Sequence, residues 1–150
     1  MIQRQLQQDR SGCGLACVAM LASIGYAQAR VLAQALGVGP KPYRYRVGAG
    51  SRTARDGYLT DARQLRRMLK LLGLRSEAER EVSDWDECDG DGIAAINYDA
   101  ANDSWHWVVH LRDRNGACVL DPNARVRSER RTDFGRMRPV RFIPVSLEPR

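Results

Sequence analysis

The sequence of 150 residues has no long apolar run, and its basic residues include only two lysines. The first six residues lack the apolar segment of a signal peptide. No window approaches the roughly eighteen apolar residues that cross a membrane. We therefore expect a cytoplasmic protein. The length, with 43% hydrophobic and 28% charged residues, predicts one domain over residues 1–150, built around one core.

The chain also lacks a CxxC motif or a Cys/His cluster with the spacing of a zinc site. Because no export signal is present, we interpret its four cysteines (Cys13, Cys17, Cys88 and Cys118) as reduced thiols. The acidic residues around Trp85 depart from the spacing of a calcium-binding loop, so residues 76–92 are interpreted as an acidic surface loop. No metal and no cofactor is expected.

Because only Lys41 and Lys70 are lysines, the net charge of +6 comes mainly from arginine. Basic residues gather at 44–55 and 125–141, with aromatic residues nearby, as on some nucleic-acid-binding surfaces. Acidic residues are interspersed, and we favour a solvated surface over nucleic-acid binding. An acidic peptide or partner protein is a further alternative.

Helical patterns come first along the chain and strand patterns follow. Helices are predicted at 13–24, ended by Gly25, at 27–36, and at 62–72 behind a cap at Thr60 or Asp61. Residues 40–57 lack helical periodicity and are predicted to be a mobile loop beside a binding cleft. Strands are predicted at 93–98, 105–111, 117–120 and 140–145. This order indicates an α+β domain, with N-terminal helices packed on a C-terminal antiparallel sheet.

Cys13 stands between two glycines, Gly12 and Gly14, where a polar segment turns into an apolar helix. Glycine allows a tight turn and a close approach of backbone to a ligand. In the first turn of a helix, free N–H groups and the positive end of the helix dipole favour a thiolate. The same N–H groups can hold an oxyanion. We therefore interpret Cys13 as a candidate nucleophile.

A catalytic thiol needs a base and a group that orients the base. The only histidines, His106 and His110, lie on one predicted strand and point to the same face. A two-residue turn at Asn115-Gly116 would place Asp121 opposite His110, and a longer or bulged turn would move the pairing towards His106. A His–Asp pair on neighbouring strands is predicted, and the spacing leaves the choice of histidine open.

Two motifs carry a family resemblance. The first motif is Gln7, five intervening residues and the run Cys13-Gly14-Leu15-Ala16-Cys17-Val18-Ala19-Met20. The second is His106-Trp107-Val108-Val109, followed by Val119-Leu120-Asp121-Pro122. Together they resemble motifs of the bacteriocin-processing, double-glycine-leader cysteine peptidases. The resemblance spans nearly the whole chain and implies a papain-like fold. It implies that Cys13 is the nucleophile, His106 the base, Asp121 the orienting carboxylate and Gln7 an oxyanion-hole amide. This sequence departs from the family at two places. Gly12 stands where the family usually has an acidic residue, and the arginine-rich segment 41–57 is unlike the usual middle of the family's sequences.

The resulting hypothesis is a stand-alone cysteine peptidase that cuts a peptide after small residues such as Gly-Gly. A peptide-export transporter would act in trans, since none follows in this sequence. Two alternatives stay open: a papain-like deamidase or amidase effector, and a peptide-binding domain of the same fold with a weak triad.

Overall fold

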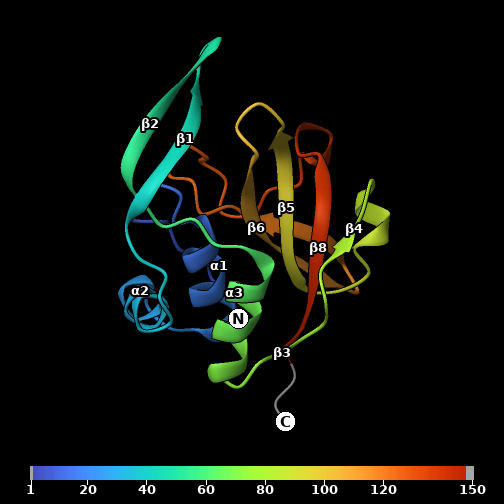
Figure 1. Cartoon of the computed structure of the whole chain (residues 1–150). Helices are drawn as coiled ribbons and strands as arrows, with labels where there is room; N and C mark the ends of the chain where they lie inside the picture. The colour runs from blue at the N-terminus through green and yellow to red at the C-terminus, as the bar shows by residue number, and fades with distance from the viewer. Residues whose placement is uncertain (1, 148–150) are drawn as a thin grey trace.

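The computed structural model describes residues 2–147, in which three helices pack on an antiparallel sheet (Figure 1). The helices are α1 (Cys13–Ala22), α2 (Tyr26–Ala35) and α3 (Ala62–Leu71). The fold is thus mixed α and β, with the helices preceding the main sheet, as predicted.

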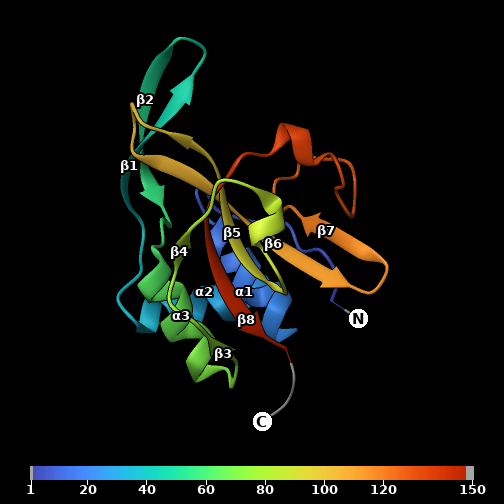
Figure 2. The same ribbon diagram turned by 90° about the vertical axis from the view of Figure 1, so that its right-hand side faces the viewer.

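The main sheet has the strand order β3-β8-β5-β6-β7, with β4 also pairing with β8 (Figure 2). Its strands are β3 (Arg75–Ser76), β4 (Arg80–Glu81), β5 (Gly92–Asp99), β6 (Ser104–Asp113), β7 (Gly116–Leu120) and β8 (Pro139–Ser146). The four longer strands match the predicted segments closely. Segment 76–92, predicted as a loop, contains β4 and a short 3-10 turn at Trp85–Glu87.

Helix α1 forms the centre of the core. Nine of its ten residues are buried, because it packs against the sheet on one side and against α2 and α3 on others (Figure 1). Its all-apolar sequence fits this position, since a helix that is apolar all round needs partners all round. Among residues 2–147 no single helix is long and apolar enough to cross a membrane; only α1 and α2 together, bent by 112°, reach that length and composition.

Helix α3 has a sharp start and one buried face. The Asp61 side chain accepts a hydrogen bond from the Gln64 backbone N–H (2.8 Å), and the Gln64 side chain accepts one from the Asp61 N–H (2.9 Å). This reciprocal pair is a capping box. Leu65, Met68 and Leu69 are buried, which leaves the basic residues of α3 on its outer side.

Two boundary predictions are wrong. Helix α1 ends two residues early, because Ser23 takes a left-handed conformation (φ 54°) as its C-cap. Gly25 instead caps the start of α2.

The predicted mobile loop at 40–57 is a hairpin of β1 (Lys41–Val47) and β2 (Gly50–Gly57), joined by a two-residue turn (Figure 1). The alternation Tyr43-Arg44-Tyr45-Arg46 has the two-residue period of a strand. The tyrosine face is half-buried, with the Arg10 guanidinium 5.4 Å from the centre of the Tyr45 ring.

The turn between β6 and β7 lies one residue earlier than predicted. Asp113 pairs with Gly116, so Arg114 and Asn115 form the turn and His110 faces Val119. The Asp113 carboxylate accepts a hydrogen bond from the Asn115 N–H (2.7 Å), which stabilises the turn at this position. Asp121 therefore does not lie opposite His110; continuing the register places it opposite Val108, two positions from each histidine.

Candidate active site

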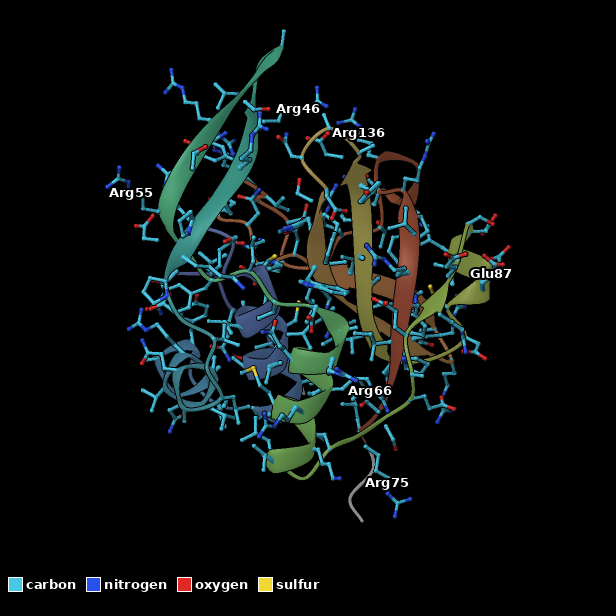
Figure 3. The ribbon with its side chains drawn as sticks, viewed as in Figure 1. Arg46, Arg55, Arg66, Arg75, Glu87 and Arg136 are labelled. Carbon is cyan, nitrogen blue, oxygen red and sulfur yellow. The ribbon has the colours of Figure 1, made fainter. Side chains whose placement is uncertain are left out.

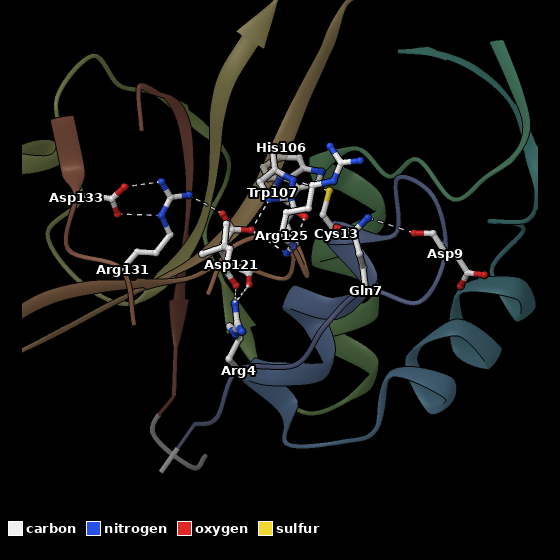
Figure 4. A network of polar contacts seen from close by, with 12 residues as sticks. Arg4, Gln7, Asp9, Cys13, His106, Trp107, Asp121, Arg125, Arg131 and Asp133 are labelled. Carbon is white, nitrogen blue, oxygen red and sulfur yellow. Dashed lines mark hydrogen bonds and ion pairs between the residues drawn. The ribbon is translucent and has the colours of Figure 1, made fainter. Parts of the chain in front are cut away.

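The Cys13 thiol lies at the N-terminus of α1, against the start of strand β6 (Figure 4). The residue is 6% exposed, and its Sγ accepts a hydrogen bond from the Trp107 backbone N–H (3.4 Å). Gly12 and Gly14 flank it closely: a Cβ on Gly14 would overlap the Thr60 hydroxyl, and one on Gly12 the Tyr26 hydroxyl. Glycine is thus required on both sides of the thiol for packing.

His106 and Asp121 form a close pair beside this thiol (Figure 4). His106 Nε2 lies 2.7 Å from Asp121 Oδ1. The ionised carboxylate can only accept, so Nε2 carries the hydrogen and donates it. The imidazole is 27% exposed and the carboxylate 2%. The other ring nitrogen, Nδ1, remains for exchange of a proton with a neighbouring group.

The electrostatics couple the thiol and the imidazole. Burial raises the pKa of Cys13, but the hydrogen bond and charge of His106 outweigh burial, helped by backbone N–H groups, so the pKa lies below 9.0. Burial lowers the pKa of His106, but Asp121 and the Cys13 sulfur raise it from 6.5 to about 10. These directions favour a thiolate–imidazolium pair.

Asp121 is held by groups from three segments. Its Oδ1 also accepts from the Asn123 N–H (2.9 Å), and its Oδ2 accepts from Arg131 Nη1 (2.7 Å). Its backbone carbonyl accepts from Arg4 Nη1 (3.3 Å). Burial raises the pKa of Asp121, but His106, with Asn123 and Arg131, brings it below 3.8. The carboxylate is therefore ionised, with fixed orientation.

Gln7 lies next to Cys13, on the N-terminal segment that runs past α1 (Figure 4). Its backbone N–H donates to the Pro122 carbonyl (3.0 Å), which ties this segment to the residue after Asp121. Its side-chain Nε2 donates a long hydrogen bond to the Asp9 carbonyl (3.3 Å), and its Oε1 is buried with no partner among the described residues. The amide can thus present an N–H to a group bound at the thiol.

His110, the other candidate base, has its contacts away from this cluster. Its Nδ1 donates to the Gly90 carbonyl (2.7 Å), and its ring stacks on Trp85 with centroids 5.6 Å apart. The side chain is fully buried, and burial lowers its pKa from 6.5. His110 is therefore a neutral core residue, and the structure brings only His106 to Asp121.

Three contributors were missed from the sequence: the Trp107 N–H, Arg131 and Arg4. The first is a backbone group of a residue predicted only as part of a strand. Arg131 reaches Asp121 because its backbone bridges Val119 through two hydrogen bonds (2.9 and 2.8 Å) outside the named strands. Neither periodicity nor spacing signals such a contact.

The remaining cysteines, Cys17, Cys88 and Cys118, are buried and free like Cys13. Burial raises the pKa of Cys17 well above 9.0 and that of Cys88 to about 11. Over residues 2–147, no group of three or more His, Cys, Asp or Glu side chains is arranged to hold a metal ion.

Comparison with known proteins gives a structural neighbour. No family model and no curated protein matches this sequence. A double glycine motif protease from an AMS/PCAT transporter, solved in complex with the leader peptide, is similar in structure, with a TM-score of 0.61 and 18% identity. The alignment covers all of this chain and 93% of that chain. The chain therefore shares the fold of that protease.

Proposed function

We propose that this chain is a papain-like cysteine peptidase with Cys13 as nucleophile, His106 as general base and acid, and Asp121 as the carboxylate that orients His106. One observation carries the proposal: the 2.7 Å His106–Asp121 pair stands beside a thiol at a helix N-terminus. Such an arrangement activates a thiol for attack on an acyl carbon. The structural likeness to a double glycine motif protease supports it.

In the acylation step, the Cys13 thiolate attacks the scissile carbonyl carbon. The C–N bond breaks, and the proton on His106 Nδ1 passes to the leaving amine, which departs with a new N-terminus. Cys13 then holds the acyl group as a thioester. The Nε2–Asp121 hydrogen bond would hold the ring in place and leave Nδ1 to exchange the proton.

In the deacylation step, a water gives a proton to His106 Nδ1 and its oxygen attacks the thioester. The acid product leaves and the thiolate–imidazolium pair is restored. The Gln7 side-chain amide and the Cys13 backbone N–H would hold the oxyanion formed in each step. When the Gln7 amide turns towards the substrate, it loses only the long 3.3 Å hydrogen bond from its Nε2 to the Asp9 carbonyl.

The substrate we propose is a peptide cut after small residues such as Gly-Gly. The structural neighbour was solved with a leader peptide, and this chain carries the same fold. The β1–β2 hairpin stands over the loop before Cys13 and is tied to the main sheet by Arg46 and Asp99 (2.8 Å). This hairpin would limit the width of the cleft. Delivery of the peptide by a peptide-export transporter belongs to the same proposal.

The test measures alkylation of each cysteine by iodoacetamide from pH 4 to pH 10, read by mass spectrometry. We expect Cys13 alone to react rapidly at pH 5 to 6, because a free thiol titrates near about 8.5 and a paired thiolate well below. His106→Ala should slow this reaction. Uniformly slow labelling that rises only above pH 8 would refute the proposed nucleophile.

Peptide hydrolysis then identifies the reaction. A peptide with an internal Gly-Gly should yield two fragments, with a new carboxylate after the second glycine, and Cys13→Ala should yield none. A mass increase of about 1 Da without cleavage would instead indicate side-chain deamidation, and the protein would then be an amidase and not a peptidase.

A further inference from the structure

The outer side of α3 forms a second cluster of charge, separate from the thiol. A hollow of about 630 Å³ lies between this helix and the segment that leads into β3. Among residues 2–147 its lining includes five cationic side chains and no carboxylate: Arg63, Arg66, Arg67, Lys70 and Arg75.

The spacing explains why these cations converge. Residues 63, 66, 67 and 70 are three or four positions apart, so they share one face of α3. Arg75 joins them because Gly73 (φ +85°) turns the chain back beside the helix. Figure 3 shows Arg66 pointing from α3 towards this returning segment.

None of the five makes an ion pair within residues 2–147, although eight other ion pairs are formed there. Like charges held this close repel one another and attract anions. Arg66 is also fixed in position: its Nε donates to the Ser76 hydroxyl (3.1 Å) and its Nη2 to the Ser76 carbonyl (3.2 Å). Its Nη1 has no such partner in the described part of the chain and can bind a ligand.

We propose that this hollow, which we call the α3 anion site, binds a compact polyphosphate. The volume lies in the range of about 300–1,000 Å³ typical of small-molecule sites. Four of the five cations are arginines, whose planar fork matches phosphate oxygens. A triphosphate concentrates its charges within a small volume, whereas the carboxylates of an acidic peptide are spread along about 3.3 Å of chain per residue.

The lining also limits what else is recognised. Of the described residues, Leu74 is the one apolar residue in the lining and none is aromatic, so they offer no surface on which a nucleobase would stack. The site should therefore bind inorganic tripolyphosphate, ATP and GTP with similar affinity. Because the α3 anion site does not include Cys13, His106 or Asp121, it does not depend on the peptidase proposal.

The test is isothermal titration calorimetry of the full chain with inorganic tripolyphosphate, ATP and GTP at 50 and 200 mM salt. We expect saturable one-to-one binding that weakens at the higher salt. Arg67→Gln and Arg66→Gln should each weaken binding about tenfold, as expected for a lost charged hydrogen bond. The exposed Arg67 side chain makes no hydrogen bond or ion pair with residues 2–147, so its replacement should leave the fold intact even if Arg66→Gln disturbs Ser76.

Arg55→Gln is the matched control, since it removes the same charge from the β1–β2 hairpin, where Arg55 points away from the body of the protein (Figure 3). It should leave binding unchanged. The proposal fails if no saturable binding occurs at 50 mM salt, or if Arg55→Gln weakens binding as much as Arg67→Gln. It also fails if a tetraglutamate peptide or a twelve-nucleotide single-stranded DNA binds more tightly than tripolyphosphate.

Discussion

Arg131 Nη1 donates a 2.7 Å hydrogen bond to Asp121 Oδ2, the carboxylate oxygen that His106 leaves free. Arg131 is itself fixed: its Nε and Nη2 bind the two oxygens of Asp133 (2.9 and 2.8 Å). The guanidinium thus bridges two carboxylates, one buried and one at the surface. In the proposed mechanism this makes Arg131 a positioning residue, which acts on His106 through Asp121.

Replacing Arg131 tests that role. Arg131→Met removes the hydrogen bond and charge that hold the Asp121 carboxylate, so the pKa of Asp121 should rise. Because the freed carboxylate can turn away from Nε2, the hydrogen bond that raises the pKa of His106 weakens, and that pKa should fall. We expect alkylation of Cys13 at pH 6 to slow about tenfold, which matches the loss of about 1.4 kcal/mol. The upper pH limit of the reactive thiolate–imidazolium pair should move down in parallel.

Arg127→Met is the matched control, because Arg127 is an exposed arginine of the same segment. It should leave both the rate and the pH limit as in the wild type, and Arg131→Lys should restore part of the rate. If Arg131→Met lowered only thermal stability, with an unchanged pH dependence, its role would be structural alone.

The pH dependence of peptide cleavage is a second prediction. Activity should appear as Cys13 ionises, at a lower pH than a free thiol would require, because His106 lowers the pKa of the thiol. It should persist until His106 loses its proton near pH 10, where its raised pKa lies. Initial rates measured from pH 4 to 11 check this profile. A decline centred near pH 6.5 would show an imidazole without support from Asp121.

The site was predictable from the sequence where local pattern decides the structure. The glycines around Cys13 and the apolar run behind it predict a helix start, and the strand patterns predict a His–Asp pair on neighbouring strands. The observed turn leaves Asp121 midway between the two histidines, and His106 alone reaches it because His110 is held by Gly90 and Trp85. Spacing alone does not contain that information, and the family resemblance was needed to favour His106.

The hairpin at 41–57 shows a different limit. Its Tyr-Arg alternation is a strand pattern, but a mobile loop was predicted because the segment lacks helical periodicity. The contacts that hold it are distant in the chain: Arg46 with Asp99, and Ser51 with Asn102 at 2.9 Å. Contacts of this kind are visible only once the fold is known.

His110 gives a third prediction, on stability. Its folded pKa lies below 6.5 because burial disfavours the charged ring, so the unfolded chain binds its proton more readily. The stability that His110 contributes is therefore complete above pH 6.5 and is lost as pH falls through the folded pKa. In His110→Phe, which retains an aromatic ring beside Trp85, the free energy of unfolding should fall less steeply between pH 6.5 and 4. Urea titrations at several pH values measure the slope, and an unchanged slope would contradict the prediction.

The fourth prediction concerns Gly12, where the resembling family carries an acidic residue. A Cβ at this position would overlap the Tyr26 hydroxyl, which donates a 2.8 Å hydrogen bond to Asp9 Oδ2. Asp9 in turn pairs with Arg30 (3.2 Å), so the hydroxyl has little freedom to move. Gly12→Ala should therefore destabilise the fold by about 1–3 kcal/mol, the usual cost of overpacking.

A double-mutant cycle with Tyr26→Phe isolates this overlap. Tyr26→Phe alone loses the hydrogen bond to Asp9, while in the double variant the methyl group meets no hydroxyl. The double variant should therefore be more stable than the sum of the two single effects predicts, as measured by urea unfolding. Strict additivity would mean that Gly12 is needed for another reason, such as the Asp9 carbonyl oxygen, which would lie 3.0 Å from the same Cβ. The cycle thus decides whether the missing acidic residue before Cys13 follows from the Tyr26–Asp9 contact that occupies its place.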